Sequence, residues 1–124
     1  MADDEAAGHS MSLELSKVYL HLMNDDQSAL AQAMKEYNIR PKNIDVNRML
    51  AEIYFHMGDM VKSKEHLTIA MRTGSKDPAS ICLEGILMTK NNQLEAGQKV
   101  IRQVFVDNPN LECSYCKEAK SMII

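Results

Sequence analysis

The sequence contains no tryptophan, only two phenylalanines and four tyrosines, and no excess of basic residues, its net charge being −3. Nucleic-acid binding uses a basic surface and aromatic side chains on which bases stack, so we expect no nucleic-acid ligand. Cysteine is also scarce. Three cysteines, an odd number without regular spacing, do not make a disulfide scaffold and indicate a reducing compartment. These absences predict a cytoplasmic protein.

Long hydrophobic runs are absent as well. No stretch approaches the roughly 20 apolar residues of a membrane helix, so we expect no membrane span. Residues 1–9 are acidic and alanine-rich, lack a periodic apolar pattern and do not resemble a secretory signal, which predicts a disordered tail. The remaining chain, 10–124, is balanced in charge and hydrophobic enough for one core. We therefore expect a single domain there.

Beyond the tail, apolar residues recur at helical intervals almost to the end of the chain. Six turn-rich breaks interrupt them, at 23–25, 40–42, 57–59, 74–78, 90–92 and 107–109. No segment shows the period of two, bounded by hairpin turns, that is typical of strands. The pattern predicts an all-α fold of about seven helices.

Several breaks carry residues that start helices. Asp77 followed by Pro78 predicts an N-cap before a proline at the first helical position. Asn92 and Glu95 have the spacing of a capping box. Aspartates at or beside positions 26 and 59 are expected to cap two further helices.

The helical segments repeat. Residues 44–75 can be laid over 78–109 without a gap, at an offset of 34 residues that mostly matches small residues with small and large apolar with large. The pairs include Ala51 with Gly85, Tyr54 with Met88, Gly58 with Asn92, Ser63 with Gly97, Leu67 with Ile101 and Ala70 with Val104. Ahead of them, Ser16 and Tyr19 precede their counterparts by 35 residues, whereas Ala29 and Ala33 precede theirs by 34. We expect the turn at 24–26 to absorb the extra residue.

The second of these segments resembles a tetratricopeptide repeat. Leu50-Ala51, Tyr54, Gly58, Ser63, Leu67 and Ala70 stand at the family's Leu-Gly, Tyr, Gly, Ala, aromatic and Ala positions. The family's tryptophan is replaced by Ser12, Asn47 and Ile81. The resemblance implies a right-handed solenoid of stacked antiparallel hairpins at about 10–41, 44–75 and 78–109, with a capping helix at about 110–122. It also implies close packing of Ala51 against Ser63.

Repeats of this family bind other proteins, and the resemblance implies that the first helix of each hairpin lines a concave groove. The implied groove positions are Leu13, Lys17, Leu20, His21, Arg48, Glu52, Phe55, His56, Cys82, Ile86, Thr89 and Lys90. Glu52 at the centre and the lack of asparagine disfavour a chaperone-tail ligand. Apolar anchors at Leu20, Phe55 and Ile86 favour an amphipathic helix or extended peptide. We thus expect an adaptor, scaffold or co-chaperone.

The cysteines permit a different chemistry. Cys113 and Cys116 have the spacing of a redox pair or half a zinc site, and Cys82 lies 34 residues before Cys116. A redox pair of the thioredoxin type requires a βαβ setting, and structural zinc requires four ligands. Helix packing would place the Cα atoms of Cys82 and Cys116 roughly 8 to 10 Å apart, too far for a disulfide. We expect three free thiols and no metal.

Two further functions remain as alternatives. One is a self-associating scaffold that docks through its end at Met122, Ile123 and Ile124; the other is a small zinc- or redox-linked protein using Cys113 and Cys116. No nucleophile stands in a recognisable catalytic motif, so we expect no enzyme and no cofactor. His21 and His56 occupy equivalent places, and we expect them at the surface.

Overall fold

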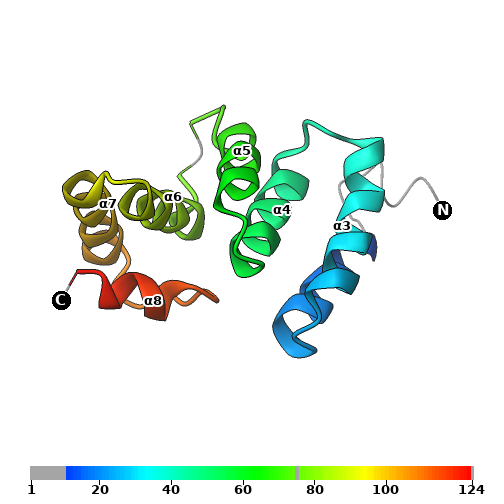
Figure 1. Cartoon of the computed structure of the whole chain (residues 1–124), viewed down its shortest axis with the longest axis horizontal. Helices are drawn as coiled ribbons and strands as arrows, with labels where there is room; N and C mark the ends of the chain where they lie inside the picture. Colours follow the sequence, from blue (N-terminus) through cyan, green and yellow to red (C-terminus); the bar gives the residue numbers. More distant parts are fainter. Residues whose placement is uncertain (1–10, 75, 124) are drawn as a thin grey trace. The chain divides into compact units, whose positions relative to one another are not determined.

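The computed structural model describes residues 11–74 and 76–123. Throughout these residues the regular structure is helical, which confirms the all-α prediction (Figure 1). The chain divides between Arg72 and Thr73 into two compact units. The expected single domain over 10–124 stays a prediction, and the expected disordered tail at 1–9 lies outside the described residues.

The first unit holds two helical hairpins. Its first helix, α2 (Met11–Lys17), continues into a π-helical turn, η1 (Val18–Leu22), and is followed by α3 (Asp26–Ile39). The second hairpin is α4 (Ile44–His56) with α5 (Met60–Ala70). The second unit contains one hairpin, α6 (Pro78–Lys90) with α7 (Leu94–Asp107), and the short helix α8 (Cys116–Ser121). The described residues therefore form seven α-helices, as predicted.

Helix boundaries repeat at the period seen in the sequence. Helices α4 and α6 begin 34 residues apart, and so do α3, α5 and α7. The turn between the helices of each hairpin contains a residue with positive φ, and these residues, Asn24, Gly58 and Asn92, also lie 34 apart. Asparagine and glycine are the residues that most readily adopt this conformation. The local chemistry of the three turns is therefore the same.

The caps follow the sequence in part. Asp77 accepts a bond from the backbone N–H of Ser80 at 3.0 Å and Pro78 is the first helical residue, as predicted. Asp59 likewise caps α5. The prediction for Asn92 is wrong, because its φ of 65° places it in the turn and Gln93 precedes the helix. At α3 the cap is Asp25, the neighbour of the expected residue.

The extra residue of the first hairpin lies inside its first helix. In η1 the N–H of Met23 bonds to the carbonyl of Val18, five residues back, at 3.1 Å. In α4 the N–H of Met57 bonds to Ile53, only four residues back, at 2.9 Å. A π-turn adds one residue to a helix without breaking it. The prediction that the turn at 24–26 absorbs this residue is therefore wrong.

Small residues stand where the two helices of each hairpin cross. Ser63 Oγ donates to the carbonyl of Ala51 at 2.7 Å, which confirms their close packing. In the first hairpin the roles reverse, and Ser16 Oγ on α2 donates to the carbonyl of Ala29 on α3 at 2.7 Å. In the third hairpin glycines meet, at Gly85 and Gly97 (next section of the chain). Larger side chains at these places would force the helices apart.

The first unit also encloses a polar joint around His66 on α5. Its Nδ1 lies 2.8 Å from Oδ1 of the fully buried Asn47. The ring stacks on Tyr54 at 5.5 Å and meets the edge of Tyr37 at 5.4 Å between centroids. Burial lowers the pKa of His66, with smaller opposing effects from neighbouring charges. Residues of α3, α4 and α5 thus share one satisfied polar contact.

The second unit ends in a shorter cap than predicted. Helix α8 covers only Cys116–Ser121, whereas the expected helix ran over about 110–122. Residues 111–115 instead form a turn, because a disulfide and a tyrosine hydrogen bond hold them against α6. Ala119 on α8 is fully buried. The end of this unit is therefore closed by a turn and a short helix together.

Candidate functional site

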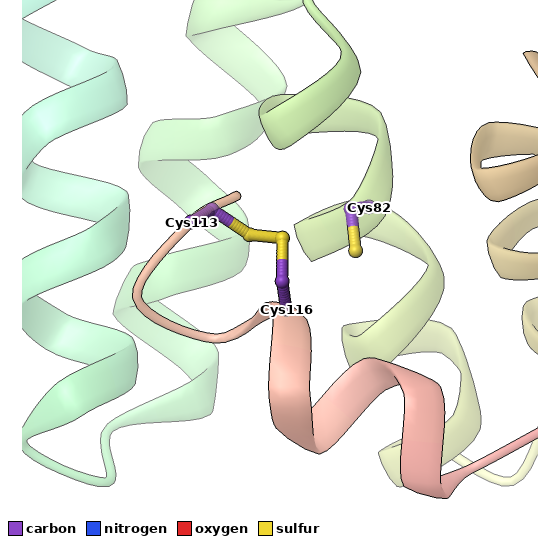
Figure 2. A group of neighbouring side chains, drawn as sticks. All are labelled: Cys82, Cys113 and Cys116. Carbon is purple, nitrogen blue, oxygen red and sulfur yellow. A yellow bond between two sulfur atoms is a disulfide. The ribbon is translucent and has the colours of Figure 1, made fainter. Parts of the chain in front are cut away.

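Three cysteines meet in the second unit. Cys82 is on α6, Cys113 lies in the turn before α8, and Cys116 begins α8 (Figure 2). Their sulfur atoms all lie within 4.8 Å of one another. Cys113 and Cys116 are joined by a disulfide, with their Cα atoms 5.0 Å apart. The cluster is thus a disulfide with a third sulfur beside it.

The prediction of three free thiols is confirmed for Cys82 and wrong for the other two. The turn brings the Cα atoms of Cys113 and Cys116 within the range that a disulfide needs. Cys82 is fully buried, and burial raises the pKa of its thiol to about 11. It is therefore protonated at neutral pH, and a thiol attacks a disulfide far more slowly than a thiolate.

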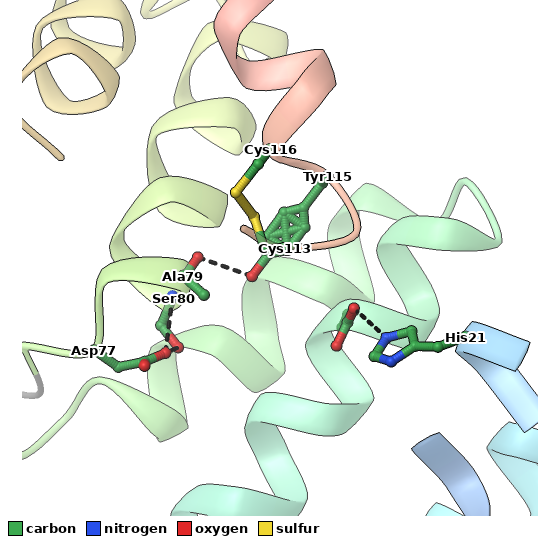
Figure 3. Close-up of a disulfide and its surroundings, with 8 residues drawn as sticks. His21, Asp77, Ala79, Ser80, Cys113, Tyr115 and Cys116 are labelled. Carbon is green, nitrogen blue, oxygen red and sulfur yellow. Dashed lines mark hydrogen bonds and ion pairs between the residues drawn. A yellow bond between two sulfur atoms is a disulfide. The ribbon is translucent and has the colours of Figure 1, made fainter. Parts of the chain in front are cut away.

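Tyrosine fixes the turn beside α6. Tyr115 is 7% exposed, and its hydroxyl donates to the carbonyl of Ala79, in the first turn of α6, at 2.8 Å (Figure 3). The N–H of Cys116 also bonds to the carbonyl of Cys113 at 3.2 Å. Because α6 begins at a strong cap, its first turn is a firm support. These contacts hold the paired cysteines close to Cys82.

The C-terminal segment also occupies the expected groove positions of α6. Thr89 Oγ1 donates to the sulfur of Met122 at 3.2 Å, and Lys90 pairs with Glu118 at 3.1 Å. Ile86 is fully buried. The prediction that Ile86 anchors a ligand is wrong, because α6 packs against both α7 and α8.

In the first unit, two histidines at expected groove positions pair with acids. His21 Nε2 lies 2.8 Å from a carboxylate oxygen of Glu52, joining η1 to α4 (Figure 3). His56 Nδ1 lies 2.8 Å from a carboxylate oxygen of Asp26, joining α4 to α3. Both histidines are exposed, as predicted. Each links two helices of the same unit.

The other expected groove residues differ in exposure. Leu20 is 3% exposed and belongs to the core, so the prediction that it anchors a ligand is wrong. Its burial follows from the packing of α2 and η1 against α3. Leu13 and Phe55 are half-buried, Lys17 is exposed and pairs with Glu14 at 3.8 Å, and Arg48 pairs with Asp45 at 3.2 Å.

The largest exposed apolar feature of the first unit was missed by the sequence reasoning. Four side chains follow one face of α2 and η1, and we call them the outer stripe: Met11 (69% exposed), Leu15 (39%), Val18 (39%) and Leu22 (80%). Their spacing of four, three and four residues is that of a helix face. That spacing was visible in the sequence, but which face of the helix is buried was not.

Comparisons of the chain with protein-family models, curated proteins and solved structures find no match. Among the described residues, no helix is long and apolar enough to cross a membrane. The geometry of the outer stripe and of the cysteine cluster is therefore what can be argued from.

Proposed function

We propose that this chain is a protein-binding module of tetratricopeptide-like hairpins whose ligand is an amphipathic helix of another protein. The observation that carries the proposal is the outer stripe. Apolar patches left exposed on a protein surface commonly mark sites of interaction. The expected concave groove is less suited, since His21 and Glu52 already bond to each other.

The repeat itself indicates what the stripe binds. Met11, Leu15 and Val18 precede Val46, Leu50 and Ile53 by 35 residues, the offset of this part of the first hairpin. In α4 all three of these counterparts are fully buried. The same positions are therefore core in the second hairpin and surface in the first.

Helix α3 covers that face of α4. Ala29 and Ala33 on α3 belong to the same core cluster as Val46, Leu50 and Ile53 on α4. No counterpart of α3 precedes α2 among the described residues. A partner helix with small residues four apart and larger apolar residues beside them would cover the outer stripe as α3 covers α4.

The expected affinity is modest. Fully burying one side chain of this size contributes about 1.5–3 kcal/mol, and Leu15 and Val18 at 39% exposure have less left to bury. Association costs at least about 4 kcal/mol in lost freedom. We therefore expect binding in the micromolar range, unless contacts beyond the stripe contribute.

Charge substitutions test the proposal. The double variant Leu15→Lys with Leu22→Lys places charges on the stripe, and Val61→Lys on α5, which is 69% exposed in the same unit, is the matched control. Partners captured from native lysate by the wild-type chain are purified and their binding measured by fluorescence anisotropy. A helical partner that binds wild type and control but not the double variant is the expected result, with circular dichroism showing all three folded.

A partner that binds the double variant as tightly as wild type would contradict this function. Self-association is the competing outcome and is read by sedimentation equilibrium of the chain alone. The expected docking end for self-association has its own contacts, because the carbonyl of Met122 accepts from Gln98 at 2.8 Å. Residue 124 lies outside the described residues.

A further inference from the structure

Protein binding leaves the three cysteines without a role. They lie in the second unit, whereas the outer stripe belongs to the first. Cys82 and Cys116 are buried and Cys113 is partly exposed. All three sulfurs converge from a helix, a turn and a helix start on one place (Figure 2). Convergence of thiols from separate elements is the arrangement of a metal site.

The distances suit zinc. Zinc binds cysteine sulfur at about 2.3 Å, so sulfurs at tetrahedral angles lie about 3.8 Å apart. The present sulfurs all lie within 4.8 Å of one another. Cys82 therefore needs to move by about an ångström, while Cys113 and Cys116 need only separate when their bond opens. Two cysteines separated by two residues are a common half-site for zinc.

We propose that Cys82, Cys113 and Cys116 bind one zinc ion when the disulfide is reduced. The three thiolates supply three corners of a tetrahedron. Because Cys113 is partly exposed, water has access to the fourth corner. Three thiolates leave the site with one net negative charge, and the disulfide form cannot bind the ion because two of its ligands are joined.

The chemistry balances with an external reductant. A phosphine takes up one sulfur-bound oxidation equivalent: the S–S bond breaks, the phosphine becomes its oxide with oxygen from water, and two thiols form. Zinc then displaces one proton from each of the three thiols, releasing three protons for each ion bound. Reoxidation of Cys113 and Cys116 by a disulfide reagent reverses the first step and expels the metal.

Competition with a chromophoric zinc chelator tests the site on the full chain. The chain is reduced with phosphine, exchanged anaerobically into reductant-free buffer and titrated with zinc. We expect one zinc per reduced chain, none per oxidised chain, and a higher melting temperature on binding, since a ligand of the folded state stabilises it. Cobalt in place of zinc should give the visible absorption of a tetrahedral thiolate site.

Variants separate three ligands from two. Cys82→Ala and Cys82→Ser should weaken zinc binding by at least the about tenfold that loss of an outer-shell partner costs. Lys117→Ala, an exposed neighbour on α8, is the control and should bind as wild type does. If Cys82→Ser remains folded by circular dichroism and binds zinc unchanged, the three-cysteine site is wrong. Zinc bound by the oxidised chain, or none bound by the reduced chain, overturns it equally. If both Cys82 variants unfold, the wild-type stoichiometry and cobalt spectrum decide.

Discussion

Replacing Gly97 with alanine should separate α6 from α7. A Cβ at Gly97 would lie 2.6 Å from the carbonyl oxygen of Gly85 and 2.8 Å from the backbone nitrogen of Thr89. Backbone atoms cannot rotate away as a side chain can. The helices must therefore move apart by about 0.8 Å to reach the 3.4 Å of ordinary contact.

The magnitude is the difference of two effects. Overpacking of a tight contact costs about 1–3 kcal/mol, and a clash with two backbone atoms belongs at the upper end. Alanine recovers about 1 kcal/mol of helix propensity relative to glycine. Gly97→Ala should thus lower the free energy of unfolding by about 2 kcal/mol. At Gly85 the nearest atom is Ile101 Cγ1 at 2.7 Å, which can shift, so Gly85→Ala should cost less.

Urea denaturation followed by circular dichroism measures the loss, with hydrogen exchange of α6 and α7 amides assigning it to the second unit. Ala96→Gly is the control, because Ala96 is exposed and directly precedes Gly97 on α7. It should cost only the about 1 kcal/mol of helix propensity. If Gly97→Ala instead stabilises the protein by that amount, or costs less than Gly85→Ala, the close crossing is refuted.

Two further predictions concern single polar residues. Because burial lowers the pKa of His66, the folded state binds fewer protons there than the unfolded state, so stability should fall as the pH drops below the ordinary pKa of 6.5. His66→Gln should remove this slope in urea midpoints measured across that range, and an unchanged slope would contradict it. Asp77→Ala should cost about 1 kcal/mol by removing the cap of α6, whereas Asp77→Asn should retain most of it. Equal melting temperatures for the two variants would argue against the cap.

Local chemistry made much of the fold readable in advance. Asp77-Pro78 starts α6 because proline is favoured at the first helical position, and Ser63 packs on Ala51 because only small residues fit a close crossing. The π-turn at Val18–Leu22 was not readable, since an extra residue can enter a helix or the turn beside it. Nor was the placement of Asn92 in the turn, because asparagine both caps helices and adopts positive φ.

The candidate sites depended more on the tertiary structure. Spacing indicated a possible half-site at Cys113 and Cys116, but not that their turn would lie beside Cys82, which Tyr115 secures from 36 residues away along the chain. Similarly, Ile86 and Leu20 have the pattern of groove residues and are buried, because neighbouring helices cover them.

The sequence by itself determined the all-α class, the helix count and the 34-residue recurrence of caps and turns, since these depend on residues close together in the chain. Only the tertiary structure decided which equivalent positions are core and which are surface. Leu50 is fully buried and Leu15 is 39% exposed, although both occupy the same place in their helices. The difference arises because burial depends on the helix that packs against a face, and a repeat has such a neighbour only where another hairpin precedes it.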